Sequence, residues 1–404
     1  MAQIADRCFK SARVSSCKCV ACFQFLLAFA LANLLVSPTR ADWLEFRGPS
    51  GDGHVSPAGH TDPIGLPLHW SETENVKWNT EIPQRGWSTP VVLGGQVWLT
   101  TATPDGHDFF AVCVDAAIGQ IRFNQKLFHC ENPEPLGNNV NAYATPSPVI
   151  EPGRVYIHFG SYGTACLDTQ NAKVVWQRED LRCRHYRGPS SSPILFGDML
   201  ILTMDGVDLQ YLIALDKKTG RTLWKTDRSV EWNDENVPGQ MARDGDLRKA
   251  HSTPLLVRSE GMLQLLSAGA KAAYGYDPVT GKELWKVRYP AWSVAPRPVY
   301  DKGLGFFVTG HGQTELIAVR LDGQGDVTDT HVAWKTDSMV PRTASPILVD
   351  GLLYMVSDDG AVTCLEASSG MQVWRSRIGG TFAASPIYGD DRIYFLVNKA
   401  RQRF

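Results

Sequence analysis

The feature that most constrains this 404-residue chain is a short pattern that returns along its length. In the clearest copy, an apolar run from Tyr211 to Leu215 leads through a turn closed by Gly220 to a second run ending at Trp224. Apolar runs on either side of a Gly-containing turn predict a β-hairpin. Trp78 repeats the aromatic residue without an acidic partner. In six copies, the clearest one included, an acidic residue stands eight positions before an aromatic one, in the pairs Asp115 and Phe123, Asp168 and Trp176, Asp216 and Trp224, Asp277 and Trp285, Asp326 and Trp334, and Glu366 and Trp374.

A second marker keeps step with the first. It is a small residue and a proline before an apolar run, and it occurs at Ser88-Thr89-Pro90, Pro146-Ser147-Pro148, Ser192-Pro193, Ser252-Thr253-Pro254, Ala295 to Pro298, Ser345-Pro346 and Ser385-Pro386. A further Gly/Asp turn lies between the two markers, so that one period holds four short strands and no helical pattern. A four-stranded repeat of roughly 40 to 60 residues is typical of a β-propeller blade. The sequence therefore predicts an all-β chain, a β-propeller of four-stranded antiparallel blades.

Composition supports one large folded unit and narrows the classes of partner. The chain is 43% hydrophobic and 20% charged, which suits a sizeable core, and the repeat predicts a single closed unit despite the length. The net charge of −2 gives no reason to expect nucleic acid as a partner.

Residues 1–41 have the features of an export signal. Basic residues precede an apolar run from Val20 to Val36, and the small residues Thr39 and Ala41 predict cleavage after Ala41. An uncleaved anchor is the alternative, because this run of 17 residues is marginal for spanning a bilayer. We therefore expect the propeller, residues 42–404, in the periplasm or secreted. Membrane contact is expected only if the segment is uncleaved.

The repeat predicts six full periods and an incomplete seventh. Within the N-terminal segment 42–80, Val76 to Thr80 is expected to form a strand that fills the last blade and closes the ring. Glu231 to Lys249 is rich in charge and is expected to be an exposed loop. The seventh period, from Ala384 to Val397, has only two strands. The full periods are 82–130, 140–183, 187–230, 250–291, 295–337 and 341–377.

The sequence leaves open whether two of the cysteines form a disulfide. Cys113, Cys166 and Cys364 share one repeat position, which predicts a small buried strand site. Cys130 and Cys183 each lie seven residues after an anchor aromatic, so they could form a disulfide in an oxidising compartment or remain free.

The run Ala214-x-Asp216-x-x-Thr219-Gly220-x-x-x-Trp224 resembles the tryptophan-docking motif of the pyrroloquinoline-quinone (PQQ) repeat family. The opening Phe46 to Pro49 and the run Leu68 to Trp78 resemble an exported, planctomycete-type branch of PQQ-like propellers. The resemblance covers nearly all of the chain after residue 41. It implies eight blades, so this chain would be about one and a half blades short. It also implies that Trp176, Trp224, Trp285 and Trp374 wedge between neighbouring blades.

The resemblance implies two different activities. Quinoprotein dehydrogenases of this fold use PQQ with calcium, a pair of adjacent cysteines and a catalytic aspartate. This chain has no adjacent cysteines, and no converging set of calcium ligands is evident. The propeller lipoprotein of the outer-membrane barrel-assembly machinery is a related scaffold without catalysis. We therefore expect no catalytic residue, cofactor or metal, with PQQ and calcium as the alternative.

The residues before each proline marker are expected to surround the mouth of a central channel. Aromatic walls with a few polar groups suit a sugar, an anion or a peptide. The alternative is that these residues pack or cap the loops. The repeated aspartates, by contrast, are expected to accept backbone N–H groups in turns. The predicted mouth residues are Trp87, Tyr143, His185, Tyr186, Arg187, His251, Trp292 and Arg342.

Three functional hypotheses remain. The first is an exported scaffold without catalysis that presents a face or its channel mouth to a protein or polysaccharide partner. The second is a PQQ-dependent oxidoreductase, and the third is a truncated product without stable activity. Function depends on particular sites rather than on the fold, so the repeat alone does not choose among them.

Overall fold

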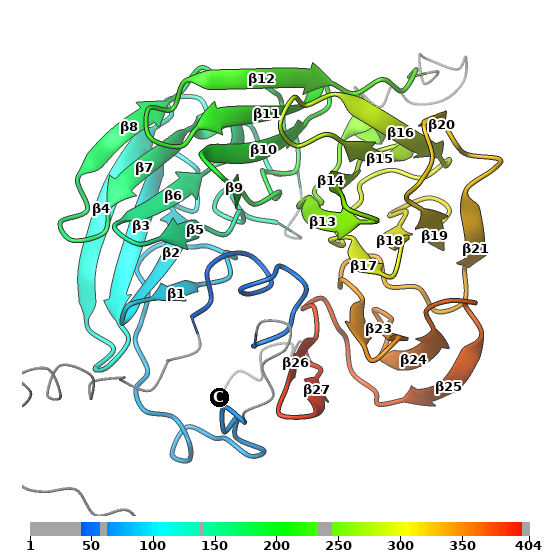
Figure 1. Ribbon diagram of the computed structural model, residues 1–404. Helices are drawn as coiled ribbons and strands as arrows, with labels where there is room; N and C mark the ends of the chain where they lie inside the picture. The colour runs from blue at the N-terminus through cyan, green and yellow to red at the C-terminus, as the bar shows by residue number, and fades with distance from the viewer. Residues whose placement is uncertain (1–41, 57–62, 138–140, 233–244, 398–404) are drawn as a thin grey trace, which may run out of the picture. The chain divides into compact units, whose positions relative to one another are not determined.

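A computed structural model describes residues 42–56, 63–137, 141–232 and 245–397, all within one compact unit, Ala41–Phe404. The predicted signal segment, 1–41, lies outside the described residues, as does most of the predicted loop Glu231 to Lys249. The described residues form seven sheets (Figure 1), and in the first six each strand pairs antiparallel with the next along the chain. The predicted β-propeller of four-stranded antiparallel sheets is confirmed.

Five sheets contain four strands, the fourth sheet contains five and the seventh contains two. A short extra strand, β20 (Gly325–Asp326), runs parallel to the outer strand of the fourth sheet. In order, the sheets comprise β1 (Val91–Leu93), β2 (Gln96–Ala102), β3 (Asp108–Asp115) and β4 (Ile121–His129); β5 (Val149–Glu151), β6 (Arg154–His158), β7 (Thr164–Asp168) and β8 (Val174–Arg178); β9 (Ile194–Phe196), β10 (Met199–Asp205), β11 (Gln210–Asp216) and β12 (Thr222–Asp227); β13 (Leu255–Ser259), β14 (Met262–Ala268), β15 (Ala272–Tyr276) and β16 (Glu283–Arg288); β17 (Val299–Asp301), β18 (Leu304–Val308), β19 (Leu316–Arg320) and β21 (Val332–Thr336); β22 (Ile347–Val349), β23 (Leu352–Val356), β24 (Ala361–Glu366) and β25 (Gln372–Arg377); β26 (Ile387–Gly389) and β27 (Arg392–Tyr394).

The acidic residue of each repeat shapes the turn before the outer strand. The Asp216 carboxylate accepts backbone N–H groups from Lys218 at 3.0 Å and Thr219 at 2.8 Å. Gly220 then adopts φ +73°, a left-handed conformation that side chains disfavour. Asp115 and Asp277 cap their turns in the same way. The interpretation of these carboxylates as turn caps is confirmed.

Four anchor tryptophans, Trp78, Trp176, Trp224 and Trp334, dock on the turn of the sheet that follows them in the chain. Trp176 of β8 donates its indole N–H to the carbonyl of Lys217 at 2.9 Å, and its ring lies over Gly220 of the next sheet. A Cβ atom at Gly220 would come within 2.7 Å of that ring. The same hydrogen bond, always to the residue after the acid, joins Trp78 to Ala116, Trp224 to Pro278 and Trp334 to Ala367. Trp285 departs from this rule, because its indole N–H donates to Gln264 of its own sheet.

The proline marker forms a second link between sheets. The residue before each proline carries a hydroxyl that accepts the backbone N–H of the equivalent residue in the previous sheet. The bonds run from Thr89 to Ser147, Ser147 to Ser192, Ser192 to Thr253, Arg297 to Ser345 and Ser345 to Ser385, each at 2.9 Å. Arg297 interrupts the series, because an arginine stands where the other repeats have serine or threonine.

The N-terminal segment Trp43 to Val55 lies among the inner strands of several sheets (Figure 1). It pairs with β1 through Trp43 and Val92, and the N–H of Ile150 in β5 donates to Leu44. At its other end, Gly53 and Val55 exchange backbone hydrogen bonds with Tyr388 of β26. His54 bonds the carbonyl of Leu348 in β22. The space among the inner strands is therefore occupied by the chain's own N-terminal segment. We did not predict this from the sequence.

A buried ion pair holds this segment in place. The Arg297 guanidinium lies 2.9 Å from the Glu45 carboxylate and donates to the carbonyls of Phe46 and Pro254. Arg47, also buried, donates to the carbonyl of Asp52 at 2.6 Å. Burial and the charge of Arg297 lower the pKa of Arg47 to about 9. Burial raises the pKa of Glu45 against the lowering effect of Arg297. The departure from the repeat at Arg297 thus anchors the N-terminal segment.

The prediction of a strand at Val76 to Thr80 is wrong. These residues form no strand, yet Trp78 docks on the first sheet as the other tryptophans dock on theirs. The stretch before it contacts the seventh sheet, where Asp390 accepts the N–H groups of Ile64 and Leu66 and Trp70 packs on Tyr394. The seventh sheet has no described strand after β27 with which this segment could pair. Side-chain and turn contacts hold the segment instead. No helix among the described residues is long and apolar enough to cross a membrane.

Candidate functional site

Several predicted mouth residues come together on one side of the sheets. The groups that act electrostatically on His251 include His185, Arg187, Lys249 and His311. Burial, followed by these neighbouring charges, lowers the pKa of His251 to about 3. His251 therefore stays neutral at neutral pH beside a group of cationic side chains.

Tyr186 is the aromatic centre of this cluster. The guanidinium of Arg187 lies 4.7 Å from its ring centroid and the Lys249 ammonium lies 5.6 Å from it. Cations over an aromatic face are attracted by its quadrupole. Lys249 is buried and bonds the carboxylate of Asp246, and burial lowers its pKa. Sequence reasoning missed Lys249, because nothing in the repeat marks it.

His185 supports a neighbouring turn. Its Nε2 accepts the backbone N–H of Ser161 at 3.0 Å, so the other ring nitrogen carries the proton. The ring also lies against Gly160, which adopts φ +61°. Burial lowers the pKa of His185 to about 4. This geometry agrees with the alternative that His185 packs against or caps a loop and does not contact a ligand.

Tyr143 is buried beneath a loop. Its hydroxyl donates to the carbonyl of Glu134 at 3.0 Å, and its ring meets Phe109 and Tyr162 edge-on. A side chain 7% exposed in such packing supports the loop and offers little surface to a ligand.

The remaining predicted mouth residues differ in exposure. Trp87 is 47% exposed, with the Arg85 guanidinium 5.9 Å from its ring centroid. Trp292 is half-buried over Gly312. Arg342 is exposed and bonds the Asp358 carboxylate at 3.1 Å. The structure thus groups His185, Tyr186, Arg187 and His251. Trp292 adjoins this group, because its backbone exchanges hydrogen bonds with His311 and the N–H of the next residue donates to the carbonyl of Lys249. Trp87 and Arg342 have the separate partners given above.

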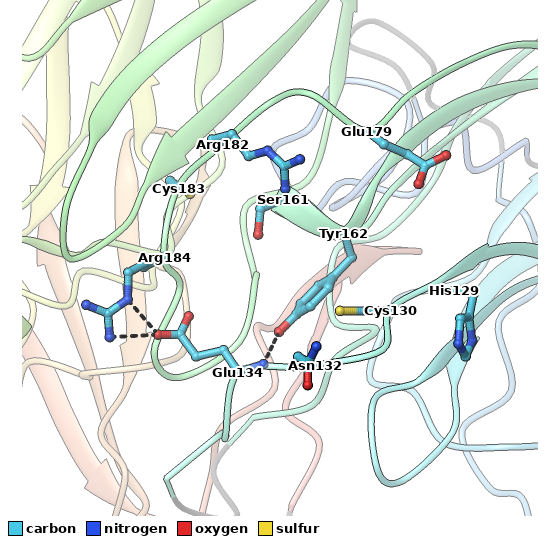
Figure 2. Close-up of a pocket in the computed structure, with 10 residues that line it drawn as sticks. All are labelled: His129, Cys130, Asn132, Glu134, Ser161, Tyr162, Glu179, Arg182, Cys183 and Arg184. Atoms are coloured by element: carbon cyan, nitrogen blue, oxygen red, sulfur yellow. Dashed lines mark hydrogen bonds and ion pairs between the residues drawn. The ribbon is translucent and has the colours of Figure 1, made fainter.

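A cleft of about 470 Å³ adjoins the cluster (Figure 2). It is lined by residues of 129–134, 161–162 and 179–184, at the ends of the first and second sheets. Glu134 joins the two regions. Its carboxylate lies 3.2 Å from the Arg184 guanidinium and accepts the N–H of Tyr186 at 3.0 Å. We call the region formed by Glu134, Tyr186, Arg187 and His251, with the buried Lys249 against Tyr186, the loop face.

Both cysteines of the possible disulfide line this cleft as free thiols. Cys183 is buried against His185, with its sulfur 3.4 Å from Nε2, and burial raises its pKa. Cys130 is half-buried. Cys113, Cys166 and Cys364 are buried, as expected for their strand position. A buried thiol with a raised pKa is a poor nucleophile, so Cys183 acts as a packing residue.

The described residues do not form the donor set of a PQQ–calcium centre. Calcium needs several converging oxygen ligands. In residues 42–56, 63–137, 141–232 and 245–397, no group of three His, Cys, Asp or Glu side chains could hold a metal ion. The space among the inner strands contains the segment Trp43 to Val55 and the Arg297–Glu45 pair.

Comparison with known proteins points to one family. A family model described as outer membrane protein assembly factor BamB matches residues 112–226, 210–327 and 325–403. The outer membrane protein assembly factor BamB of Yersinia pestis is 22% identical over 221 residues, which are 53% of this chain and 51% of that protein. The chain thus spans about half the length of this curated relative.

A solved BamB structure shares the fold. The crystal structure of BamB from Moraxella catarrhalis superposes with a TM-score of 0.58 at 16% identity, over 80% of this chain and 86% of that one. A quinohemoprotein alcohol dehydrogenase of Pseudomonas putida HK5 gives a TM-score of 0.47 at 12% identity, over 87% and 75% of the two chains. The similarity to the BamB structure supports a common fold, and at 16% identity it carries no site residues from that protein to this chain.

Proposed function

Because the chain belongs to the family of outer membrane protein assembly factor BamB, we propose that it is a β-propeller scaffold that works outside the cytoplasm and binds a protein partner through its loop face. The observation that carries this proposal is the cleft beside the Tyr186 cluster. The signal-like residues 1–41 support export. A protein is favoured over a polysaccharide because the family description is that of a protein assembly factor.

The chemistry of the loop face suits a protein surface. An aromatic ring flanked by cations can take a carboxylate or a backbone carbonyl, and Arg and Tyr are enriched where proteins bind one another. Glu134 and Arg184 provide a charged pair of opposite sign at the cleft. Such groups fix the orientation of a partner and hold it by hydrogen bonds at the rim of the contact. Catalysis is not part of this proposal.

The test is photocrosslinking in the producing cell. A photoreactive amino acid replaces Arg187 on the loop face, and a matched variant carries it at Met262, exposed at the turn where β14 begins. Because β13 runs from the proline marker to this turn, Met262 lies at the opposite end of the sheet. We expect a discrete protein adduct from position 187 alone, in the fraction outside the cytoplasm. Equal adducts from both positions, or none, would contradict the proposal, and a glycosidase-sensitive smear would identify a polysaccharide.

A thermal unfolding experiment separates the scaffold from the other two hypotheses. A ligand that binds only the folded protein raises the melting temperature. We expect a cooperative transition that PQQ with calcium does not shift. A saturable rise of several degrees would instead favour the oxidoreductase, and the lack of a cooperative transition would favour a truncated product.

A further inference from the structure

The cleft beside the loop face has a lining that suits a small ligand of its own. Its volume of about 470 Å³ is typical of small-molecule sites, which span about 300–1,000 Å³. It lies at the ends of the first and second sheets, both of which have all four strands. Figure 2 shows the ring of Tyr162 among the other side chains of the lining. The chemistry of that lining indicates which ligand the cleft fits.

The charges of the lining balance. The carboxylates of Glu134 and Glu179 are matched in number by the guanidinium groups of Arg182 and Arg184. Glu134 and Arg184 already pair, with 3.2 Å between the carboxylate and the guanidinium. An anionic ligand would meet two carboxylates and a cationic ligand two guanidinium groups, and placing like charges together costs binding energy. The lining therefore favours a ligand without net charge.

Several polar groups of the lining have hydrogen-bonding capacity left. Among the described residues, the side chains of Asn132, Ser161 and Arg182 have no hydrogen-bond partner. The Glu179 carboxylate accepts one bond, from the Gln177 amide at 3.3 Å. These amide, hydroxyl, guanidinium and carboxylate groups offer both donors and acceptors. An apolar ligand would displace water from them and leave them unpaired, which is unfavourable. The ligand therefore needs groups that both donate and accept hydrogen bonds.

Tyr162 gives the cleft a rigid aromatic surface. Its ring stacks on that of Phe109, with the centroids 4.7 Å apart, and its hydroxyl accepts the N–H of Glu134 at 3.2 Å. A half-buried ring held in this way offers apolar contact area next to the polar groups. A ligand that uses the whole lining therefore combines an apolar face with hydroxyl groups around it. The ring of a neutral sugar has this combination, with C–H groups on its face and hydroxyl groups at its edge.

An extended polypeptide fits this lining less well than a sugar does. Such a segment commonly binds by adding to a strand edge through main-chain hydrogen bonds. Of the lining residues only His129 belongs to a strand, as the last residue of β4. Its imidazole already bonds the Asp108 carboxylate at 2.6 Å. The open groups of the cleft are side chains, and a planar carboxylate or guanidinium can bond two neighbouring hydroxyl groups at once.

We propose that the cleft between the first and second sheets binds a neutral sugar. The face of the sugar ring packs on Tyr162, and its hydroxyl groups donate to Glu179 and accept from Arg182. Asn132 and Ser161 supply the remaining polar contacts. This inference goes beyond the proposed protein partner, because it gives the cleft beside the loop face a ligand of its own.

The test measures sugar binding by the purified full chain. An array of neutral oligosaccharides built from glucose, galactose, mannose and N-acetylglucosamine identifies the sugar, and calorimetric titration then gives its affinity. We expect saturable binding at one site per chain. Arg182→Ala and Glu179→Gln should each weaken binding by about tenfold, since each removes a hydrogen bond to a charged group. Arg154→Ala removes an equally accessible arginine at the other end of β6 and should leave the affinity unchanged.

Three results would overturn the proposal. The first is that no neutral oligosaccharide of the array binds. The second is an affinity that neither Arg182→Ala nor Glu179→Gln changes, which would place the sugar elsewhere. The third is tighter binding of glucuronic acid or of the dipeptide alanylalanine, which would show that the cleft selects a charged ligand. A chain that binds the sugar but gives no protein adduct from position 187 would contradict the protein partner alone, and the reverse result would contradict the sugar site alone.

Discussion

The seam between the second and third sheets and the seam after the sixth sheet are built from the same local parts. Both have a tryptophan on an outer strand that packs on an aromatic residue of its own sheet. They differ in the neighbour, since a capped turn closes the first and the described residues leave the second open. Each repeat thus contributes a tryptophan and the sheet on which that tryptophan packs. The turn of the next repeat then buries most of the tryptophan side chain.

The largest expected difference comes from removing the two tryptophans. Trp176→Ala should lower the free energy of unfolding by about 4 kcal/mol, because it removes a buried ring and leaves a cavity. Trp374→Ala should cost about 1 kcal/mol, because the side chain is already 42% exposed to water. Urea unfolding of both variants measures the difference. Equal losses would show that the open seam is closed in solution.

The next largest loss of unfolding free energy is expected from a substitution in the turn that lies under Trp176. Gly220→Ala combines a left-handed backbone with a collision against the Trp176 ring, and we expect a loss of about 3 kcal/mol. Gly197 in the same sheet has φ +55° and nothing within 4 Å of an added Cβ. Gly197→Ala should therefore cost only about 1 kcal/mol of backbone strain. Urea unfolding that gives the same loss for both would argue against close packing on the glycine.

Acid should weaken the closed seams. Burial lowers the pKa of His185 to about 4, so the unfolded chain binds more protons than the folded one between about pH 6.5 and 4. Stability therefore falls as the pH falls through this window, by about 2 kcal/mol for this histidine. Burial also lowers the pKa of His158 and of His251 to about 3, so both contribute in the same direction. His185→Gln should therefore reduce the dependence without abolishing it, measured as urea midpoints at pH 7 and pH 4.

The period of the repeat explains why the fold could be predicted. Strand pairing, turn capping by Asp216 and docking of Trp176 all depend on residues within one period or its neighbour, and their spacing recurs. Each copy therefore supports the interpretation of the others. The resemblance correctly implied the docking of Trp176 and Trp224, whereas Trp374 is left 42% exposed among the described residues.

The centre and the loop face were harder to predict because their contacts are not periodic. The hydrogen bond between His54 and Leu348 joins residues 294 positions apart. Arg297 departs from the repeat in the sequence, but its partner Glu45 lies in a segment without any repeat. Lys249 reaches Tyr186 from an insertion between sheets. Among the predicted mouth residues, exposure depends on local packing, so Tyr143 is buried and Trp87 is open.

The smallest expected losses of unfolding free energy come from removing two hydroxyl groups of the proline marker. Ser192 accepts the buried N–H of Ser147 between closed sheets, whereas Ser385 accepts the part-buried N–H of Ser345 beside the two-stranded sheet. Ser192→Ala leaves a buried donor without a partner and should cost about 1–2 kcal/mol. Ser385→Ala should cost about 0.5 kcal/mol, because water can reach the freed N–H. Hydrogen exchange at Ser147 and Ser345 reports both changes at their own sites. If the Ser345 amide exchanges as slowly as that of Ser147 before any substitution, the end of the sheet series is as closed as its middle, and the openness at Trp374 is confined to its outer edge.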